Sequence, residues 1–475
     1  MPADALIAEL RAELGSQRVR AEPTEVALYD RDASIVRAGR AAVVCLPRTT
    51  AEVQACVRAA RRHGVAFVAR GSGTGLAGGA VPVDGAVVIV TTGMDHILEV
   101  DVEARVAWVE PGVLNLDLTR AVAAPGLHFA PDPSSQQACT VGGNVANNSG
   151  GPHCLSYGVT SAHVLAIEVV LPDGELVVLG GLDPEPPGYD LRGAFVGSEG
   201  TLGIATRIAV RLTPNPPAVR TVLAGFDSVS DAASCVSAVI AAGLVPAALE
   251  MLTGAMIAAV ESYVHAGFPL EAAAVLLAEV DGSPNIVADG AALIESVAWA
   301  NAATSVRVAS TEAERMLWWK GRKSAFGAVA RIAPNYYLHD TVVPRTKLVA
   351  VLAAVEEIAA RYDLVVLNVF HAGDGNLHPL LVFDARDPGV LERVHAAGDE
   401  IITASLAAGG VLSGEHGIGI EKRDHMAEQF DPPSLDAQAR LREAFDPDGV
   451  ANPTKILPAG SRCGDLQHIP EGLWV

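Results

Sequence analysis

The sequence predicts an α+β protein of two or three domains. Between residues 40 and 215, short Val- and Ile-rich runs such as AAVVCLP and AVVIVTT alternate with Gly-rich turns, which predicts strands joined by many loops. Between residues 216 and 415, Ala-rich helical stretches alternate with strand-like runs such as AVLLAEVDG. The Pro-rich segment LTPNPP at 212–217 separates the two regions. With 475 residues, half of them hydrophobic, the chain is long enough to bury a sizeable core.

Both ends of the chain carry helical patterns. The first residues, MPADALIAELRAELG, form an acidic amphipathic pattern and do not have the basic and apolar regions of a signal peptide. The tail, SLDAQARLREAFDPDGVANPTKILP, predicts an amphipathic helix that ends at a Pro-Asp-Gly turn. The uncharged segment Ala232 to Leu249 is rich in small residues and is interrupted by Pro246. It predicts a buried helix that turns into a strand, and not a membrane span.

Charge and cysteine content exclude several classes of function. The chain has 55 acidic and 34 basic residues, and its net charge of −21 argues against affinity for nucleic acid or anionic membrane. The six cysteines are scattered and form no C-x-x-C pair, so the sequence indicates neither a disulfide framework nor an iron-sulfur site. We therefore expect a cytoplasmic protein in a reducing compartment.

A glycine-rich loop, VARGSGTGLAGGAVP at 68–82, contains the formal dinucleotide fingerprint Gly73-x-Gly75-x-x-Gly78. The Rossmann form of this motif opens a helix, but here the glycines continue into another apolar strand, AVVIV. Consecutive N–H groups with few side chains can instead form a nest for a pyrophosphate. An ordinary glycine-rich turn remains the alternative for this loop taken alone.

Two further loops have the same character. PDPSSQQACTVGGNVANNSGG at 131–151 combines small residues, amides and hydroxyls, and FVGSEGTLGIAT at 195–206 repeats the pattern. A long polar loop inside a compact domain is usually functional. Three such loops in one region indicate a large ligand that carries phosphate.

The stretch HAGDGNLHP at 371–379 places His371 and His378 around a run of Gly, Asp, Gly and Asn. On a straight strand these two positions would point to opposite faces, and the glycines disfavour a helix. Both histidines can reach one metal ion only if the chain bends, which Gly373 and Gly375 permit. Two unrelated polar residues on a surface turn remain the alternative from this stretch alone.

Six motifs occur in an order that resembles a known family. They are the glycine loop at 70–79, DPSS…TVGGNVANNSGG, GSEGTLGI, HAGDGNLHP, SGEHGIG at 413–419, and FDPDGVANPTKILP. The chain resembles the FAD-linked 2-hydroxy-acid dehydrogenases of the vanillyl-alcohol oxidase superfamily over nearly its whole length. The stretch RKSAFGAVARIAPNYYLHDTVVPR at 322–345 looks most like the FAD-binding D subunits of glycolate oxidases.

The resemblance implies an α+β fold with a two-subdomain FAD-binding domain of the vanillyl-alcohol oxidase type, an α+β substrate-cap domain and a helical C-terminal return. The expected boundaries are 1–215 for the FAD-binding domain, 216–415 for the substrate and metal cap, and 416–475 for the segment that returns to the FAD domain.

The resemblance also implies FAD as cofactor. Some relatives attach FAD to a histidine in or near the glycine loop, and this loop has none, so we expect noncovalent FAD. The pyrophosphate would lie on Arg70 to Gly75, and Asn452 would approach the isoalloxazine. The residues expected to bind the cofactor are Arg70, Gly71, Ser72, Gly73, Thr74, Gly75, Gly78, Pro131, Asp132, Ser134, Thr140, Gly143, Asn147, Gly150, Gly158, Glu199, Gly203, Ile204 and Asn452.

The same resemblance groups His371, His378 and Glu415 around one divalent metal, for which we expect Zn. Two histidines and one carboxylate leave coordination positions open for a substrate. His416 is the candidate base for the hydroxyl proton, with a third metal ligand or a structural histidine as its alternatives. Arg322 stands where the family keeps an arginine for the substrate carboxylate. Its alternative is an ordinary charge on a helix surface.

These residues predict metal-assisted oxidation of a small 2-hydroxy acid, glycolate or D-lactate, to the 2-oxo acid. Ala325, Phe326 and Leu338 look too apolar for a second carboxylate, although D-2-hydroxyglutarate stays an alternative substrate. A flavin-independent metallohydrolase is the competing class. Because the chain has no iron-sulfur cysteines, we expect the electrons to leave through a partner iron-sulfur subunit or a quinone, and the resemblance also allows a further FAD-binding partner subunit. A homodimer, and attachment to a membrane surface through a partner, are left open.

Overall fold

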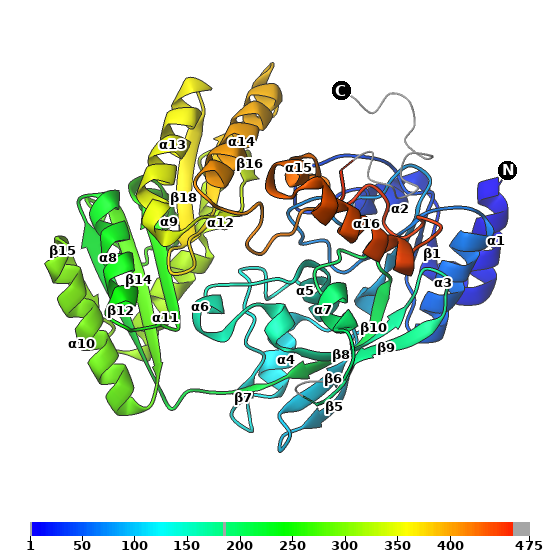
Figure 1. The fold of residues 1–475 in the computed structure, drawn as a ribbon, viewed down its shortest axis with the longest axis horizontal. Coiled ribbons are helices and arrows are strands. Elements are labelled where there is room, and N and C mark those ends of the chain that lie inside the picture. The colour runs from blue at the N-terminus through cyan, green and yellow to red at the C-terminus, as the bar shows by residue number, and fades with distance from the viewer. Residues whose placement is uncertain (1, 184–186, 459–475) are drawn as a thin grey trace. The chain divides into compact units, whose positions relative to one another are not determined.

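The computed structural model describes residues 2–183 and 187–458 (Figure 1). Cys463, one of the six scattered cysteines, lies outside the described residues. The chain divides into two compact units. The first unit comprises Met1–Gly150, Val159–Asn215 and Glu415–Val475, and the second comprises Gly151–Gly158 and Pro216–Gly414.

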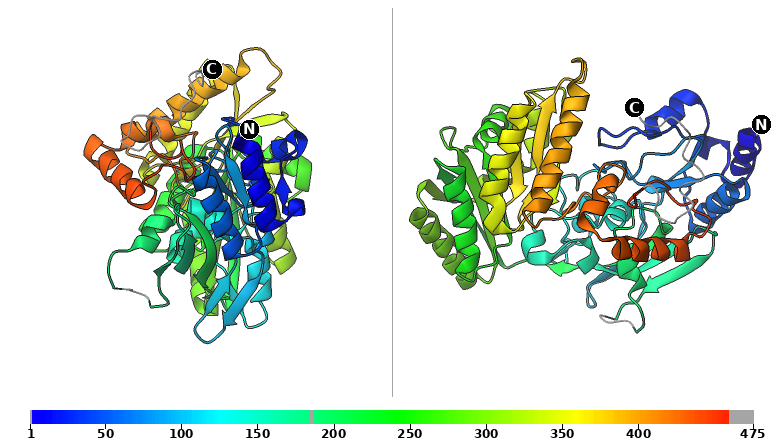
Figure 2. Two further views of the ribbon diagram at one scale, coloured as in Figure 1. Left: turned by 90° about the vertical axis from the view of Figure 1, so that its right-hand side faces the viewer. Right: turned by 45° about the horizontal axis from the view of Figure 1, so that its top comes forward.

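The first unit contains a four-stranded sheet in the order β1 (Val19–Arg20), β2 (Val43–Cys45), β4 (Val87–Val90), β3 (Phe67–Arg70). The last three strands are parallel, and β1 is antiparallel to β2. Helices α1 (Pro2–Leu14) and α3 (Thr50–Arg62) lie side by side, as both figures show in blue (Figures 1 and 2). Their apolar faces share one core with the sheet, through residues such as Leu10 and Val53. The predicted amino-terminal helix is thereby confirmed.

A second sheet in this unit is antiparallel, in the order β5 (Ile97–Asp101), β6 (Val106–Val109), β10 (Ile204–Arg211), β8 (Val164–Val170), β9 (Leu176–Gly180). Its core also takes in residues of α4 (Asn115–Ala121), α5 (Val141–Asn147) and α7 (Leu191–Phe195). Phe445, at the end of α16 (Pro432–Phe445), packs against this core. The predicted tail helix is confirmed, and it begins where Asp431 caps the N–H of Ser434. The shorter elements here are α2 (Pro23–Val26), β7 (Leu127–His128), β11 (Thr213–Pro214) and α15 (Met426–Gln429).

The glycine loop follows β3 directly, and the next helix or strand is β4, which begins at Val87. Residues 71–86 are all described, and no helix opens on the glycines among them, so the prediction that this is not a Rossmann loop is confirmed. Strands β3 and β4 pair in parallel, which makes the loop part of the crossover between them.

The second unit is built on a nine-stranded antiparallel sheet. Its main path is β15 (Ala303–Val308), β12 (Ala218–Phe226), β14 (Ala274–Gly282), β13 (Ala248–Thr253), β18 (Val365–His371), β19 (Asn376–Leu377), β17 (Thr341–Val342), and β20 (Pro379–Phe383) joins β18 to β16 (Asn335–Leu338). Figure 2 shows α13 (Leu348–Arg361) and α14 (Val390–Ala407) side by side in yellow and orange. The remaining helices of this unit are α6 (Cys154–Tyr157), α8 (Val229–Ala241), α9 (Gly254–Val264), α10 (Pro284–Ala300), α11 (Glu312–Lys323) and α12 (Ala325–Val329).

The uncharged segment Ala232 to Leu249 contains most of α8 and the start of β13. The prediction of a buried helix turning into a strand is therefore confirmed. Within residues 2–183 and 187–458, no helix combines the length and the apolar character that crossing a membrane requires.

Candidate active site

The first unit contains a cavity at the ends of its glycine-rich loops. Five of the residues expected to bind the cofactor line it. They are Arg70, Gly71, Gly143, Gly203 and Ile204. Residues from all three loops therefore meet at one cavity, as a single large ligand would require.

Arg70 supplies the buried positive charge of this cavity. Its side chain is 9% exposed, it lies over the Tyr29 ring at 5.7 Å, and its Nη1 has no hydrogen-bond partner among the described residues. Burial lowers the pKa of Arg70, and the nearby Asp32 acts in the opposite direction. A buried guanidinium nitrogen without a protein acceptor fits an anionic group such as a pyrophosphate.

The glycine loop and the second polar loop pack directly on each other. A Cβ at Gly71 would collide with the Oγ1 of Thr140, which caps α5 by accepting the N–H of Gly143 at 3.2 Å. The hydroxyl of Ser72 donates to the carbonyl of Ala138 at 2.6 Å. Gly71 is thus required by a close approach of two loops, which leaves backbone rather than side chains facing the cavity.

The returning tail joins the same place through Glu199 and Asn452. Asn452 Nδ2 donates to the carbonyls of Gly79 at 2.8 Å and Glu199 at 2.6 Å, while its Oδ1 is buried without a partner among the described residues. The Glu199 carboxylate accepts the N–H groups of Ile418 at 2.7 Å and Gly419 at 2.8 Å. Burial raises the pKa of Glu199 to about 7, although these N–H groups oppose the rise.

The other expected cofactor residues are distributed over both units. Asn147 donates to the carbonyl of His416 at 2.8 Å, and the Gly75 carbonyl accepts from Ala33 at 3.0 Å. Gly158 belongs to the second unit. The remaining ones belong to the first unit and are Gly73, Thr74, Gly78, Pro131, Asp132, Ser134 and Gly150.

The HAGDGNLHP stretch forms a tight hairpin in the second unit. Strand β18 ends at His371, which pairs with Asn376 of β19, and the turn between them includes Gly375 with φ 76°. His378 lies two residues beyond Asn376 and so projects on the same face as His371. The two rings are 5.0 Å apart and nearly perpendicular, and each histidine offers a ring nitrogen within 4.8 Å of the other. The bend that a common ligand requires is present.

Glu250 holds both His371 and Arg322, and the sequence reasoning missed it. Glu250 lies in β13 directly opposite His371 of β18, and its Oε1 is 2.8 Å from His371 Nδ1. Its Oε2 accepts from Arg322 Nε at 2.6 Å. Burial acts to raise the pKa of Glu250, but Arg322 and His371 outweigh burial and lower it. The available signal was a single acid inside an apolar strand run, AALEML.

Arg322 is a buried residue of α11, 1% exposed, and not the helix-surface charge of the alternative interpretation. Arg315, Trp319 and Arg322 lie on one face of the helix, since they are four and three residues apart. Arg322 Nη1 has no hydrogen-bond partner among the described residues, and Nη2 forms an ion pair with Glu250 at 2.5 Å. An unused donor on a buried, fixed guanidinium fits a substrate carboxylate.

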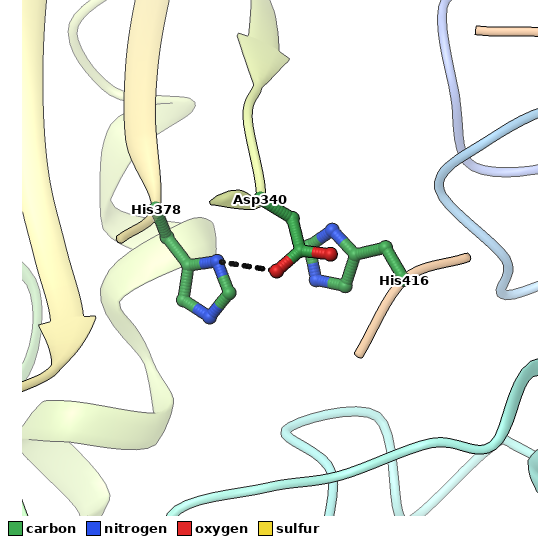
Figure 3. A group of neighbouring side chains, drawn as sticks. All are labelled: Asp340, His378 and His416. Atoms are coloured by element: carbon green, nitrogen blue, oxygen red, sulfur yellow. Dashed lines mark ion pairs between the residues drawn. The ribbon is translucent and has the colours of Figure 1, made fainter. Parts of the chain in front are cut away.

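Asp340 is a second residue that the sequence reasoning missed. Figure 3 shows its ion pair with His378, in which Asp340 Oδ1 is 3.9 Å from Nδ1. The fully buried carboxylate also accepts from Asn376 Nδ2 at 2.6 Å, from Ser413 Oγ at 2.6 Å and from the Gly414 N–H at 3.1 Å. Asp340 therefore joins the histidine hairpin to the last residues of the second unit.

Glu415 and His416 begin the final segment of the first unit, directly after Gly414. Their side chains are partly buried, and His416 Nε2 is 3.7 Å from Glu415 Oε1. His416 also appears in Figure 3. The peptide bond to Gly414, which Asp340 anchors, joins these two residues to the second unit.

The donor set of the hairpin suits a divalent metal ion. Imidazole nitrogens and carboxylate oxygens are the ligands of Zn²⁺ in proteins, and His371 has the carboxylate partner on Nδ1 that usually accompanies a ligating histidine. The residues present thus fit the expected ion.

Comparison with known proteins identifies the family. A model described as FAD linked oxidases, C-terminal domain, matches residues 215–456, and one described as FAD binding domain matches residues 41–180. The chain belongs to the FAD-linked oxidases and is an FAD-linked oxidoreductase similar to the D subunit of glycolate oxidase.

Among its relatives is glycolate oxidase subunit GlcD of Escherichia coli strain K12, 44% identical over 450 residues that cover 94% of this chain and 90% of the relative. GlcD of Bacillus subtilis strain 168 is 41% identical, with coverage of 92% and 93%. A D-lactate dehydrogenase of Anaerostipes hadrus is 34% identical, with 91% of each chain covered.

Solved structures confirm the fold. A crystal structure of p-cresol methylhydroxylase with bound substrate superimposes with a TM-score of 0.82 over 96% of this chain and 97% of the other, at 17% identity. The 4-ethylphenol oxidase from Gulosibacter chungangensis gives a TM-score of 0.81 at 21% identity, with coverage of 96% and 98%. The predicted α+β fold of the vanillyl-alcohol oxidase type is confirmed, and at these identities the likeness concerns the fold alone.

Proposed function

We propose that this protein oxidises a small 2-hydroxy acid, glycolate or D-lactate, to the corresponding 2-oxo acid. The observation that carries the proposal is Arg322, a buried arginine whose Nη1 has no hydrogen-bond partner among the described residues. It shares the Glu250 carboxylate with His371 of the histidine hairpin. One carboxylate therefore holds a group suited to a substrate carboxylate beside a group suited to a metal ion.

The names of the relatives support this substrate class. Three relatives above 40% identity are named glycolate oxidase subunits, and one at 34% identity is named D-lactate dehydrogenase. The guanidinium of Arg322 suits a single carboxylate, and Ala325 and Leu338 near it in sequence are buried and apolar. These features favour a monocarboxylate over D-2-hydroxyglutarate.

Different residues bind the substrate, accept its hydroxyl proton and hold the metal ion in the proposed oxidation. Arg322 binds and orients the carboxylate of the acid, and a neutral imidazole of His416 accepts the hydroxyl proton. His371, His378 and Glu415 would hold the divalent metal, for which Zn²⁺ is the first candidate. The bound metal supplies Lewis acidity that favours loss of the hydroxyl proton, and bound FAD supplies the acceptor for the hydride from C2.

The electrons must then leave the flavin. Five cysteines lie within the described residues, and four of them are buried. Cys45 and Cys56 interact with each other, but two neighbouring thiols are not the four-cysteine ligand set of an iron-sulfur cluster. We propose a partner iron-sulfur protein or a quinone as the acceptor. A flavin-independent hydrolase is disfavoured because the FAD-binding domain matches over residues 41–180.

The test is the visible spectrum of the purified, FAD-loaded protein, recorded without oxygen before and after glycolate or D-lactate is added. Bleaching of the flavin absorption by either acid is the expected result. If neither acid bleaches the flavin and D-2-hydroxyglutarate does, the monocarboxylate proposal is wrong. If the flavin is released into the supernatant by acid precipitation, the expected noncovalent attachment is supported as well.

A further inference from the structure

We propose that Glu250 is a positioning residue that sets the metal-binding tautomer of His371 and, through the same carboxylate, fixes Arg322 for the substrate. This inference rests on the proposed function. It assigns a role to a residue that neither binds the metal nor touches the substrate, and it predicts that metal binding depends on a carboxylate in the neighbouring strand.

The geometry of β13 and β18 supports this role. Glu250 and His371 are directly opposite each other in the antiparallel ladder, so their side chains lie on the same face of the sheet. Glu250 is fully buried, and its second oxygen, Oε2, accepts a hydrogen bond from Arg322 Nε at 2.6 Å, so a permanently charged guanidinium faces this carboxylate. A carboxylate accepts hydrogen bonds only, so His371 Nδ1, 2.8 Å away, must carry the proton.

Protonation of Nδ1 decides which ring nitrogen can bind a metal. In a neutral imidazole one nitrogen donates and the other carries the lone pair, so a proton on Nδ1 makes Nε2 the ligating atom. The partner on Nδ1 also restrains the ring orientation. Glu250 thereby prepares His371 as an Nε2 ligand.

Replacement by glutamine tests this argument because glutamine has one acceptor and one donor group. Arg322 can only donate, so the amide oxygen of the introduced glutamine would be drawn to the guanidinium. The amide NH₂ would then face His371 Nδ1 and favour a lone pair there, which moves the proton to Nε2. That tautomer cannot bind a metal through Nε2. Glu250→Gln is therefore expected to lower the affinity for the metal ion more than it lowers the affinity of Arg322 for the substrate.

The chain offers a matched control in Glu279. It is 2% exposed, lies in β14 opposite Ala248, and so projects from the same face of the sheet as Glu250. It contacts a histidine and an arginine as well, with Nε2 of His153 at 3.3 Å and Nε of Arg315 at 3.1 Å. Glu279→Gln removes a buried carboxylate of the same kind without changing the partner of His371.

The experiment is a calorimetric titration of the metal-free, FAD-loaded protein with Zn²⁺. Glu250→Gln is expected to raise the Kd for Zn²⁺ by about 10- to 100-fold, whereas Glu279→Gln leaves it unchanged. Glu250→Asp keeps two acceptor oxygens and is expected to bind Zn²⁺ more tightly than Glu250→Gln. At saturating Zn²⁺, the kcat of Glu250→Gln should return towards the wild-type value, because a high Zn²⁺ concentration fills the site despite the unfavourable tautomer of His371. Its KM should return less, because KM depends on the position of Arg322.

A second measurement needs no variant. Nitrogen-15 spectra of the metal-free wild-type protein should show His371 with the proton on Nδ1, and a proton on Nε2 would overturn the inference. Equal Zn²⁺ affinities for Glu250→Gln and Glu279→Gln would also overturn it, since the role of Glu250 would then be structural alone. If Zn²⁺ binding depends on Glu250 but no hydroxy acid bleaches the flavin, the substrate proposal fails and the positioning role stands.

Discussion

Arg322 illustrates how a single residue can be located from the sequence while its environment cannot. Its position in WWKGRKSAF and the family resemblance selected it, but an exposed helix charge remained possible. The structure buries it beside Glu250, which is 72 residues away along the chain. Pairing of distant strands and helices determines such contacts, and local periodicity carries no information about them.

We predict that Arg322→Lys raises the KM for glycolate or D-lactate by about 10- to 100-fold, because a charge-assisted hydrogen bond of about 1.5–3 kcal/mol is lost. Lysine keeps the charge but lacks the planar fork of donors. Steady-state kinetics would measure the change. The Zn²⁺ affinity of the metal-free protein should stay the same, since Glu250 still faces His371. Arg315→Lys, on the same face of α11, is the control, and an equal rise in its KM would contradict the assignment.

Glu279 gives a prediction for pH dependence. Burial acts to raise its pKa, but His153 and Arg315 outweigh burial and lower the pKa below the usual 4.5. A depressed carboxylate pKa stabilises the folded protein above the unfolded-state pKa, and this contribution is lost as the pH falls through the folded-state pKa. The difference in unfolding free energy between wild type and Glu279→Gln should therefore be present at neutral pH and shrink below about pH 4.5.

Urea denaturation of both proteins across this pH range would measure the difference. A difference that stays constant through acid pH would show that the pKa of Glu279 is not depressed in the folded state. The titration concerns stability alone, because within the described part of the chain Glu279 contacts His153, Arg315, Trp319 and Thr221 and neither member of the histidine hairpin.

The β18–β19 hairpin shows what a sequence motif can predict about an element. The glycines of HAGDGNLHP permitted a bend between the two histidines, and the hairpin contains such a bend. The motif did not predict that β13 would pair with β18 and bring Glu250 to His371, which are 121 residues apart. It also gave no sign of Asp340, which links the hairpin to Ser413 and Gly414. The two histidines could be identified from a short stretch of sequence. Their carboxylate partners could be identified only from the pairing of strands that are distant in the sequence.

We predict that Gly375→Ala disrupts the hairpin and weakens Zn²⁺ binding. Gly375 has φ 76°, and a Cβ there would overlap the carbonyl oxygen of Val343. The left-handed conformation alone costs an alanine about 1–2 kcal/mol, and the overlap adds to this. Thermal unfolding and Zn²⁺ titration would report both effects.

Gly389 provides the matched control for this substitution. Its φ is 70°, and a Cβ there would meet no atom of the described residues within 4 Å. Gly389→Ala should therefore show the conformational cost without the overlap and without any change in Zn²⁺ affinity. Equal destabilisation by the two substitutions would mean that the backbone near Val343 moves easily and that the hairpin is not rigid.

The whole chain is organised as two compact units, and the sequence indicated a change of character near LTPNPP at 212–217. The chain passes between the units after Gly150, Gly158, Asn215 and Gly414. Composition could indicate the passage near residue 215, because a Pro-rich segment marks it. The short segment Gly151–Gly158 also belongs to the second unit, but its composition did not indicate this. It belongs there because of contacts with distant residues, such as that of His153 with Glu279.

This division predicts that FAD and Zn²⁺ mainly stabilise different units against unfolding. The cavity with the glycine loops lies in the first unit, while two of the three expected metal ligands, His371 and His378, lie in the second. A ligand that binds only the folded state stabilises it by about 2.7 kcal/mol when present at 100 times its Kd.

Because the chain forms two units, differential scanning calorimetry should resolve two unfolding transitions, as multidomain proteins often show. FAD should raise the temperature of one transition and Zn²⁺ mainly that of the other, and His371→Ala should abolish only the Zn²⁺ shift. A single transition that both ligands move equally would mean that the four passages of the chain make the two units unfold together.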